Sequence, residues 1–579
     1  MHRRGFSFSI FSLLWASVTA QSENSTYYNP VLPGWHSDPS CVHVDGIFYC
    51  VTSTFIAFPG LPVYASKDLV NWKLASHGWN RESQLPGLSW RSEGQQRGMY
   101  APTLRYHDEE FYLICEYLGM AEGAVGVVFK TSDIFDDEAW SDPVTFATDR
   151  IDPDLFWDDD GKVYAATQGI LLQELDLQTG EMSQPPIEIW TGTGGVWPEG
   201  PHFYKKDGWY YLMIAEGGTA TDHAVTIARS KNITGPYESN PKNPVLTNRG
   251  TNQYFQTVGH ADLFQDGDGN WWGMCLATRS GPQYQIYPMG REAVLFPVTW
   301  EDGEWPVMQP VRGEMTGWPL PPRSRDLPGN GPFNSDPDEY DFGEDVGLPP
   351  HFVHWRVPKN GTFSVAENGL EIVPSRNNLT GILGPGETAE LSGRRGLAFV
   401  GRRQTHSLFD FTVDLSFDPQ GNNEEAGVTV FLTQMNHIDL GVVRLSETDP
   451  QLSLRFRAEG TGMRPQPKVV PVPDTWPSGP IRLQIQAVST SQYELSAMPV
   501  DDPESKIVVA TASGQLLSGG TGSFVGSLVG VYATCNAEGT GVECPGEGKA
   551  IFQRWRYTGE VQYITATETV PEDYNTGEA

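Results

Sequence analysis

The sequence is poor in basic residues, and it contains neither a second long apolar run after its N-terminus nor a sustained amphipathic helical pattern. Its 39 lysines and arginines stand against 72 aspartates and glutamates, which gives a net charge of −33. So acidic a chain repels phosphate backbones and anionic lipids, so nucleic acids and membrane surfaces are poor candidates for its partners. No later segment approaches the ~20 apolar residues that a membrane-spanning helix needs.

Cysteine is also scarce. Six cysteines are too few for a disulfide-dense scaffold, and their spacing fits no zinc site. Cys41 and Cys50 flank the segment CVHVDGIFYC, in which a two-residue Asp-Gly turn would place them opposite each other in a hairpin. Cys535 and Cys544 close a short glycine-rich loop. Both pairs are therefore plausible disulfides of a protein from an oxidising compartment.

The N-terminus has the features of a secretory signal peptide. The segment MHRRGFSFSIFSLLWASVTA combines two arginines, an apolar stretch and a small-residue cleavage site that ends at Ala20. We expect a signal peptide over residues 1–20 and a secreted, extracellular protein. Sequons for N-glycosylation support this expectation and lie at Asn24, Asn232, Asn360 and Asn378.

Glycine and proline are abundant, with 62 and 44 residues, which indicates many turns and favours an all-β fold. A module made of a short strand, an acidic turn and an aromatic-rich strand recurs five times. Its copies are DPSCVHVDGIFYCVTS, APTLRYHDEEFYLICE, DPDLFWDDDGKVYAAT, EGPHFYKKDGWYYLMI and HADLFQDGDGNWWGMC. The copies are about 50 to 60 residues apart, the length of one four-stranded blade with a variable loop. The sequence therefore predicts a five-bladed β-propeller over residues 21–323.

A second domain follows the propeller. Residues 324–342 are rich in Pro, Gly, Asn and Asp and are predicted to form a linker. Beyond them, runs such as FDFTVDLSFDP, AGVTVFLTQ and IRLQIQAVS alternate apolar and polar residues between regularly spaced turns. This pattern is typical of a β-sandwich, which we predict over residues 343–560, with a flexible tail over 561–579.

The repeat also predicts where chemistry is located. Asp38, Asp152, Glu199 and His260 each open a module, seven or eight residues before its turn acid. Equivalent positions in a closed radial repeat form a ring, so these side chains are expected to meet at one mouth of the central channel. A single Asp-Pro pair would indicate only a loop. Three crowded carboxyls raise one another's pKa and reduce stability, a cost that proteins tolerate mainly at functional sites.

Such a set of acids suits the hydrolysis of a glycosidic bond. One carboxyl group protonates the departing oxygen, and another activates water or attacks directly. A third acid can keep the pKa of the proton donor high by repulsion between like charges. Asp154 is the nearest competitor for this third position, but it lies further along its strand than Asp152. Aromatic residues close by could stack on sugar rings or simply fill the core: Phe55, Phe58, Trp79, Trp90 and Tyr100.

Several segments of the chain also resemble a known family. The segments HSDPSCVHVDGIFYC, YAPTLRYHDEEFYL, RIDPDLFWDDDGKVY, WPEGPHFYKKDGWYYLMIAEGGT and GHADLFQDGDGNWW are similar in order and spacing to glycoside hydrolase family 43. The resemblance is to the branch of β-xylosidases and α-L-arabinofuranosidases, which carries a concanavalin-like C-terminal sandwich. It implies a five-bladed propeller. It also implies that Asp38 is the general base, Asp152 the orienting and pKa-tuning acid, and Glu199 the general acid.

The same resemblance implies further site residues. It places a central histidine, which lies near a water or a calcium ion in relatives, at His260. It places a substrate-contacting arginine at Arg291 and an aromatic side chain of the sugar subsite at Phe55. Tyr100 stands where many relatives have tryptophan, which leaves the substrate preference open. No cofactor is required, although a structural calcium near His260 is possible.

The sequence thus predicts a secreted, exo-acting, inverting hydrolase of xylan-derived oligosaccharides, without choosing between β-xylosidase and α-L-arabinofuranosidase. A retaining fructosidase with a similar propeller is an alternative, as is a glycan-binding protein that has lost catalysis. A loop of the sandwich, around residues 524–532, is expected to close one side of the propeller mouth. The sequence does not indicate an oligomeric state.

Overall fold

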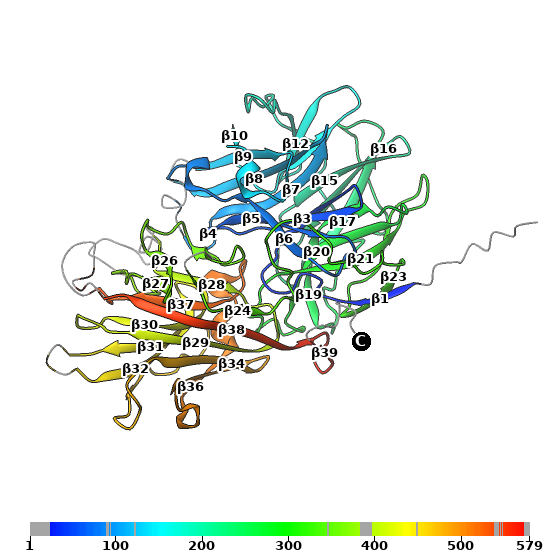
Figure 1. The fold of residues 1–579 in the computed structure, drawn as a ribbon. Coiled ribbons are helices and arrows are strands. Elements are labelled where there is room, and N and C mark those ends of the chain that lie inside the picture. Colours follow the sequence, from blue (N-terminus) through cyan, green and yellow to red (C-terminus); the bar gives the residue numbers. More distant parts are fainter. Residues whose placement is uncertain are drawn as a thin grey trace, which may run out of the picture.

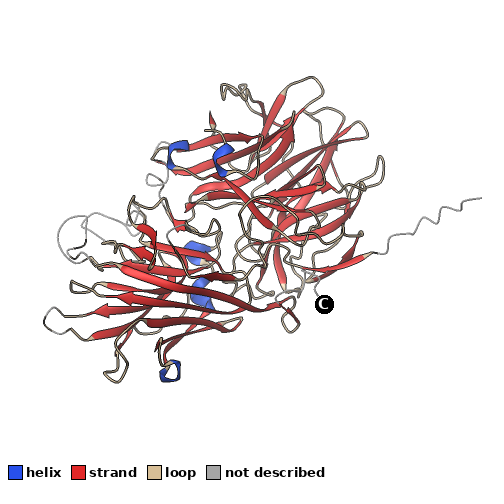
Figure 2. Ribbon diagram, viewed as in Figure 1, coloured by secondary structure: helices blue, strands red, loops and turns tan. Residues whose placement is uncertain are grey.

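The computed structural model describes residues 24–571, except for 88–91, 93, 121–122, 344–346, 382–395, 447, 449, 538–543, 545 and 547. Regular secondary structure in the described chain is almost entirely β-strand, as predicted (Figure 2). Within this part no helix is long and apolar enough to cross a membrane. The predicted signal peptide over 1–20 lies outside the described residues. Five short 3-10 helices occur in the described part: η1 (Glu82–Gln84), η2 (Asp137–Ala139), η3 (Pro503–Ser505), η4 (Gly514–Leu517) and η5 (Gly520–Gly522).

Five four-stranded antiparallel sheets follow one another along the first half of the chain, and we call them blades 1 to 5. Each contains one of the repeated modules, whose two strands are the first two of the blade. Blade 1 consists of β2 (Ser40–Val44), β3 (Ile47–Val51), β5 (Gly60–Ser66) and β6 (Lys73–Trp79). Blade 2 consists of β7 (Gly98–His107), β8 (Glu110–Met120), β9 (Gly123–Thr131) and β10 (Val144–Ala147).

Blades 3 to 5 repeat this order. Blade 3 consists of β11 (Asp154–Trp157), β12 (Val163–Thr167), β13 (Leu171–Glu174) and β14 (Ile187–Glu188). Blade 4 consists of β15 (Glu199–Lys206), β16 (Trp209–Glu216), β17 (Ala224–Ser230) and β18 (Glu238–Ser239). Blade 5 consists of β19 (Phe255–Gln265), β20 (Trp271–Arg279), β21 (Glu292–Thr299) and β22 (Val307–Met308). The segment before blade 1 packs beside blade 5, because Leu32 forms a bridge to Ala293 of β21. In the same segment β1 (Ser25–Tyr28) pairs with β23 (Glu314–Gly317), which follows blade 5.

The second half of the chain forms a sandwich of two sheets beside the propeller (Figure 1). One sheet has six strands: β28 (Phe399–Arg403), β37 (Leu528–Thr534), β30 (Glu425–Thr433), β31 (Asn436–Arg444), β32 (Leu452–Glu459) and β33 (Lys468–Pro471). The other has nine: β26 (Phe363–Ala366), β27 (Gly369–Ile372), β38 (Ala550–Tyr563), β29 (Leu408–Phe417), β34 (Ile481–Ser489), β35 (Gln492–Pro499) and β36 (Ile507–Ser513), with β24 (Asp338–Tyr340) and β39 (Thr569–Pro571) beside β38.

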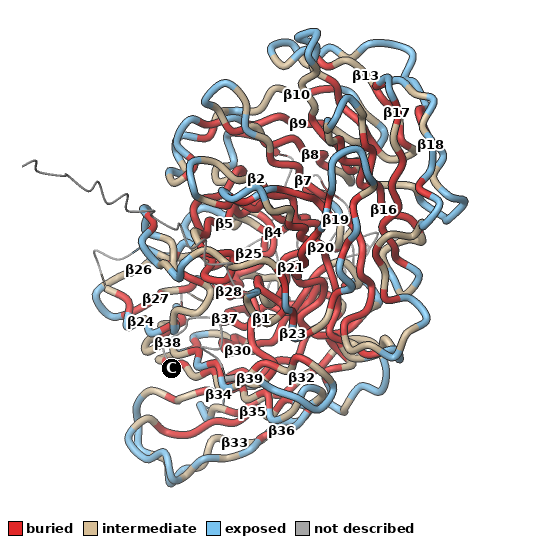
Figure 3. Tube along the Cα trace, turned by 90° about the vertical axis from the view of Figure 1, so that its right-hand side faces the viewer, coloured by how far each residue is buried: buried red, intermediate tan, exposed pale blue. Residues whose placement is uncertain are grey.

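Alternation along the strands explains this architecture. In β34, IRLQIQAVS, every second residue up to Ala487 is buried between the sheets, as the period-two pattern predicts. The buried parts of both domains lie along the strands, while the exposed parts are mainly turns and edges (Figure 3). The hydrophobic core of the sandwich continues into the propeller through Trp35, Phe55, Ile56 and Ala57, so the two domains share apolar contacts.

The domains are also joined by strand pairing and by hydrogen bonds. β25 (His354–Trp355) of the second half pairs with β4 (Ala57–Phe58) of the first. The predicted linker packs on blade 1, where the Leu74 N–H donates to the Pro332 carbonyl at 2.9 Å. The predicted flexible tail begins too early in the chain. β38 continues to Tyr563, β39 pairs back onto it, and the Gln562 side chain accepts from Arg279 of blade 5 at 2.7 Å.

Both predicted disulfides are present, Cys41–Cys50 and Cys535–Cys544. The first joins two residues that face each other across the β2–β3 hairpin, as the Asp-Gly turn predicts. It therefore fixes the register of the hairpin that follows Asp38.

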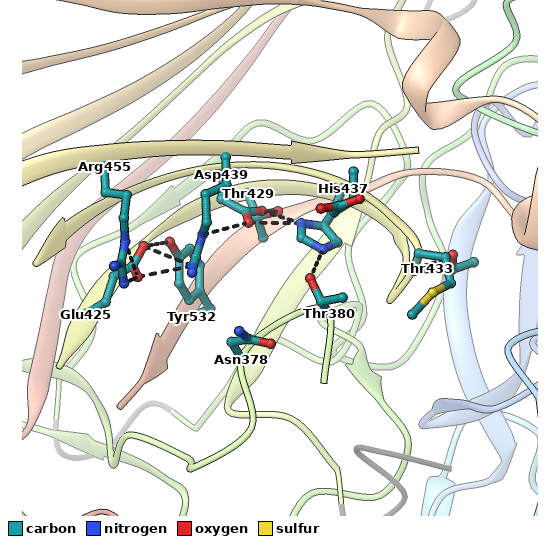
Figure 4. A network of polar contacts seen from close by, with 12 residues as sticks. Asn378, Thr380, Glu425, Thr429, Thr433, His437, Asp439, Arg455 and Tyr532 are labelled. Carbon is teal, nitrogen blue, oxygen red and sulfur yellow. Dashed lines mark hydrogen bonds and ion pairs between the residues drawn. The ribbon is translucent and has the colours of Figure 1, made fainter. Parts of the chain in front are cut away.

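A buried polar network lies on the outer face of the six-stranded sheet (Figure 4). The Tyr532 hydroxyl donates to Glu425 at 2.7 Å, and the Thr429 hydroxyl donates to Asp439 at 2.8 Å. His437 continues the network, with its Nδ1 2.9 Å from Asp439 and its Nε2 2.9 Å from the Thr380 hydroxyl. These contacts satisfy the buried charges and hold the β30–β31 turn, which faces the propeller.

Candidate active site

The backbone at the start of each blade has an unusual conformation. Asp38, Ala101, Asp152 and His260 have φ angles of 53°, 25°, 58° and 49°, and the corresponding angle of Gly200 is 55°. Left-handed φ values strain residues other than glycine and cluster at functional sites. The recurrence of this bend at the same place in the blades turns the side chains of Asp38, Asp152 and His260 toward one another.

The predicted equivalence of the four positions is wrong by one residue in blade 4. Gly200 shares the positive φ angle of Asp38, Ala101, Asp152 and His260, whereas Glu199 does not. The ring position of blade 4 is therefore Gly200, and Glu199 precedes it. The β-bulge that follows Glu199 has counterparts after Tyr100 in blade 2 and after Gly259 in blade 5, which aligns Gly200 with Ala101 and His260. Glu199 still joins the acids, since its charge raises the pKa of Asp152.

Asp38 is a buried carboxylate with several partners. Arg291 donates to both of its oxygens, at 3.0 and 3.3 Å, and the Ser53 hydroxyl donates at 2.6 Å. Burial alone would raise the pKa of Asp38, but Arg291, His260 and the bond from Ser53 outweigh burial and lower it. Asp38 is therefore held in its charged form.

Asp152 and Glu199 are in the opposite electrostatic situation. The only hydrogen bonds to their carboxyl groups among the described residues come from the Gly200 N–H to Asp152 at 3.1 Å and from Gln168 to Glu199 at 3.3 Å. Burial, followed by the charges of Glu199 and Asp38, raises the pKa of Asp152 well above its usual value. Burial and the charge of Asp38 raise the pKa of Glu199 to about 7. Because neighbouring carboxyls titrate together, this pair retains a proton near neutral pH while Asp38 is ionised.

Arg291 connects the acids with the sandwich. Its Nε donates to the backbone carbonyl of Phe524 at 3.1 Å, and its guanidinium lies 5.2 Å from the centre of the Phe524 ring. Phe524 in turn stacks near Phe55, with ring centres 6.1 Å apart, and Tyr100 meets Phe55 edge-on at 4.9 Å. The predicted substrate residues Arg291, Phe55 and Tyr100 are thus brought together, and the predicted sandwich segment supplies a fourth member.

Beyond this aromatic wall lies a cavity of about 460 Å³ at the boundary of the two domains. The propeller contributes residues 94–97 and Tyr100 to its lining, and the sandwich contributes Met435, Thr521 and Phe524. The volume lies within the range of small-ligand sites. The sandwich therefore shapes the surroundings of the acids directly. Its contact with the propeller is fixed here by Gln95 and Gln434, which exchange two hydrogen bonds of 3.0 Å.

His260 is central, as expected. Its Nδ1 lies 3.7 Å from Asp38 and 4.0 Å from Asp152. Burial is the main reason that the pKa of His260 is lowered to about 4. The ring is therefore neutral near pH 7, and it separates the two carboxyls without adding charge.

A second layer of charges lies beneath His260. Arg105 donates to Asp154 at 2.6 Å, to Asp262 at 2.9 Å and to His202 Nδ1 at 2.9 Å. Asp154 is thus paired with an arginine and is not a member of the acid trio, in agreement with the choice of Asp152. Because an arginine N–H always donates, His202 Nδ1 accepts, and the proton of the neutral ring lies on Nε2.

These contacts do not fit a calcium ion near His260. Calcium takes six to eight oxygen ligands. Here Asp154 and Asp262 are already paired with the Arg105 guanidinium, and His202 presents an N–H donor rather than a lone pair. Among the described residues no group of three or more His, Cys, Asp or Glu side chains could hold a metal.

A fourth acid was not predicted from the sequence. Glu116 is fully buried in β8, and neither of its carboxyl oxygens has a hydrogen-bond partner among the described residues. Burial, followed by the charge of Asp152, raises the pKa of Glu116 well above its usual value. The sequence feature that could have indicated this residue is a single acid within the apolar run YLICEYLGM.

Two of the other predicted aromatics do not belong to the site. Trp79 is fully buried in blade 1, and Phe58 packs edge-on against it, with ring centres 5.2 Å apart. Both are core residues, which was the alternative interpretation of each. Trp90 lies outside the described residues.

Comparison with known proteins identifies the family. Residues 27–306 match the model of glycosyl hydrolases family 43, and residues 339–558 match the beta xylosidase C-terminal concanavalin A-like domain. A non-reducing end alpha-L-arabinofuranosidase of Bacteroides ovatus, BoGH43B, is 35% identical over 535 residues, which cover 91% of this chain and 94% of that protein. The chain belongs to glycosyl hydrolase family 43. It is accordingly a glycoside hydrolase.

Other family 43 relatives match over similar lengths. The xylosidase/arabinosidase 43B of Humicola insolens is 31% identical over 546 residues, which cover 89% of this chain and 95% of that protein. The solved structure of the xyloglucan GH43B of Bacteroides ovatus superposes with a TM-score of 0.78 at 33% identity, covering 92% of this chain and all of that one. The BlXynB structure from Bacillus licheniformis gives the same TM-score at 27% identity. The family's propeller and sandwich thus extend over nearly the whole described chain.

Proposed function

We propose that the protein is a secreted, exo-acting and inverting hydrolase that removes single β-xylosyl or α-L-arabinofuranosyl residues from xylan-derived oligosaccharides. One observation carries the proposal: two buried carboxyls close to each other have opposite protonation preferences. Arg291 keeps Asp38 ionised, while burial and repulsion keep a proton on the Asp152–Glu199 pair. Glycoside hydrolysis needs this combination of a base and an acid.

The chemical step follows from these preferences. Asp38 accepts a proton from a water molecule whose oxygen attacks the anomeric carbon. Glu199 gives its proton to the glycosidic oxygen as the bond from that oxygen to the anomeric carbon breaks. The sugar leaves with inverted configuration, Asp38 is then protonated, Glu199 is charged, and exchange with solvent restores both. Burial and the charge of Asp38 keep the pKa of Glu199 high, while Asp152 accepts the Gly200 N–H and so fixes the backbone beside Glu199.

The contacts of the sandwich support exo action. Phe524 covers Phe55 and binds Arg291 through its carbonyl, so the sandwich closes the acid pocket on that side. A polymer chain cannot pass over a mouth closed in this way, whereas a chain end or a side branch can enter it. The relatives named as xylosidases and arabinofuranosidases support pentoses as the sugar that enters.

Export and cofactor independence are parts of the same proposal. The N-terminal arginines, apolar stretch and small-residue cleavage site support removal of residues 1–20 on secretion. Two disulfides are consistent with an oxidising compartment. The carboxyl groups supply both proton transfers, so the reaction requires no cofactor.

The test is hydrolysis of an aryl β-xyloside, an aryl α-L-arabinofuranoside and sucrose by the same preparation. We expect turnover of one or both aryl pentosides and none of sucrose. Proton NMR of the first-formed product should show the anomer opposite to that of the substrate. Sucrose cleavage, or a retained anomer, would favour the fructosidase alternative, and no turnover would favour a glycan-binding role.

A further inference from the structure

A tryptophan stands exposed two residues before Glu199. Trp197 has 64% of its surface accessible and is the one exposed tryptophan in the described part of the chain. Its φ angle is 53°, which is rare for a bulky residue and is retained only where the surroundings enforce it. Neither packing nor local conformational preference therefore accounts for its position.

The surrounding contacts enforce this conformation. The buried Glu216 carboxylate accepts from the Thr193 N–H at 2.9 Å, from the Thr193 hydroxyl at 2.9 Å and from the Gly195 N–H at 3.0 Å. Next to these bonds, the Gly217 N–H donates to the Val196 carbonyl at 2.8 Å. The segment that presents Trp197 is thus tied down at residues 193, 195 and 196, which is the preorganisation expected of a binding surface.

The position of the ring relates it to the acids. A methyl group built on Gly218 would lie 3.5 Å from the Trp197 ring, so the ring rests beside this glycine. The next residue, Thr219, accepts from Arg291 at 3.0 Å, and Arg291 binds Asp38. Trp197 therefore stands exposed to solvent two residues before Glu199, and Gly218 and Thr219 connect it with Arg291 of the acid pocket.

From this geometry we infer that Trp197 is the platform on which the leaving-group sugar of the substrate stacks. The inference rests on the proposed function and specifies a residue of the leaving-group site. A proton donor must lie beside the glycosidic oxygen, between the sugar held by the buried acids and the group that departs. The side of Glu199 that faces solvent is thus the leaving-group side, and Trp197 lies there.

The chemistry of the platform indicates the class of ligand. An indole face offers a broad apolar surface with a negative quadrupole, which suits the slightly positive C–H face of a pyranose ring. The platform is flat and carries no charge, so it selects for a ring rather than for a particular hydroxyl pattern. The leaving group is therefore a neutral pyranose, such as the next xylose unit of an oligosaccharide.

The experiment compares a substrate whose leaving group has a ring with one whose leaving group has none. Xylobiose and β-xylosyl fluoride form such a pair, and the arabinofuranosyl counterparts serve if that sugar is preferred. Trp197→Ala should lower kcat/KM for the disaccharide about tenfold, mainly through KM, which is the size of one aromatic contact. It should leave kcat/KM for the fluoride unchanged. Trp197→Phe should retain most of the activity on the disaccharide.

Val307→Ala is the matched control, since it truncates another exposed apolar side chain, on the outer strand β22. It should leave kcat/KM unchanged for both substrates. Equal losses on both substrates in Trp197→Ala would show that the residue acts on the bound pentose or on Glu199, which overturns the inference. No loss on either substrate overturns it as well. If the unaltered protein cleaves none of these glycosides, the proposed function itself fails and this inference falls with it.

Discussion

Arg291 binds both carboxylate oxygens of Asp38, while its Nε donates to the backbone carbonyl of Phe524 in the other domain. One guanidinium thus keeps the proposed base charged and attaches the wall of the pocket to it. Several expected outcomes follow from this arrangement and from the carboxyl pair that faces it.

Replacement of Glu199 by alanine should preserve activity only on substrates that have good leaving groups. Glu199→Ala should lose at least about a hundredfold in kcat/KM on xylo-oligosaccharides, because no group protonates the departing oxygen. It should keep far more activity on dinitrophenyl glycosides, whose leaving group needs no proton. Asp38→Ala should be inactive on both substrates, since no base remains to activate water. Steady-state kinetics on the two substrates measures the difference, and equal losses for both variants would contradict the assigned roles.

The pH profile of the unaltered enzyme should fall on the alkaline side near pH 7. The pKa of Glu199 is about 7, and its protonated form is the proton donor, so activity is lost as the pH rises through this value. The measurement is kcat/KM against pH. Asp152→Asn should leave this alkaline limb near pH 7, because burial and the charge of Asp38 raise the pKa of Glu199 and the neutral Asp152 adds no charge. A limb moved to lower pH would show instead that the charge of Asp152 tunes Glu199.

Replacement of Arg291 by methionine should move the acidic limb of the same profile to higher pH. Arg291 is the largest influence that lowers the pKa of Asp38, and without it burial raises that pKa. The base would then be protonated at pH values where the wild-type base is ionised. Breaking a buried pair costs about 3 kcal/mol, so a lower melting temperature should accompany the shift. Arg249→Met, at an exposed position, is the control and should change neither property.

Glu116→Gln should stabilise the protein at neutral pH. The pKa of Glu116 is raised in the folded state, so its stabilising contribution is complete below the unfolded value near 4.3 and declines as the pH rises above it. Glutamine remains neutral, so its advantage in melting temperature should be absent at pH 4 and grow toward pH 8. Glu188→Gln, on an exposed strand, is the matched control. An advantage that is independent of pH would mean that Glu116 is ionised in the folded protein or that packing decides the effect.

Phe524→Ala should open the pocket. The substitution removes the ring that covers Phe55, so binding of a chain end should weaken and kcat/KM on xylobiose should fall about tenfold. Longer xylo-oligosaccharides should lose less, because an open groove can hold more than one unit. Chromatography of the products from linear xylan would detect any released oligosaccharides. If the variant releases only monosaccharide and at the original rate, the sandwich does not shape the pocket.

Most of the architecture could be predicted from the sequence, because the repeat consists of recognisable turns and of strands in which apolar and polar residues alternate. Each predicted hairpin with an acidic turn forms the first pair of strands in a blade, and Asp38 and Asp152 follow from the spacing. Spacing failed by one residue in blade 4, where Gly200 and not Glu199 aligns with Ala101 and His260 at a β-bulge that blades 2, 4 and 5 share. Bulges depend on the packing of neighbouring strands and leave no reliable pattern in the sequence.

Other features of the site depend on contacts between distant segments. Arg291 and Phe524 are separated by 233 residues, and only folding shows that they touch. Glu116 lies in an apolar strand, and only the folded structure shows that it is near Asp152. The predicted end of the sandwich was wrong because local composition suggested less structure than the contacts produce. Residues 561–571 are polar enough to suggest a free tail, but strand pairing and the Arg279 contact hold them in place.

The bond from Arg291 to the Phe524 carbonyl also bears on how such enzymes can diversify. A backbone carbonyl imposes no requirement on the residue that carries it, only on where the chain runs. Residue 524 can therefore change in lineages without disturbing the partner of Asp38, while an insertion or deletion in its loop cannot. Exchange of whole sandwich domains between relatives should preserve this bond only where the loop has the same length. Such exchange offers evolution a way to alter the pocket wall while the propeller chemistry stays intact.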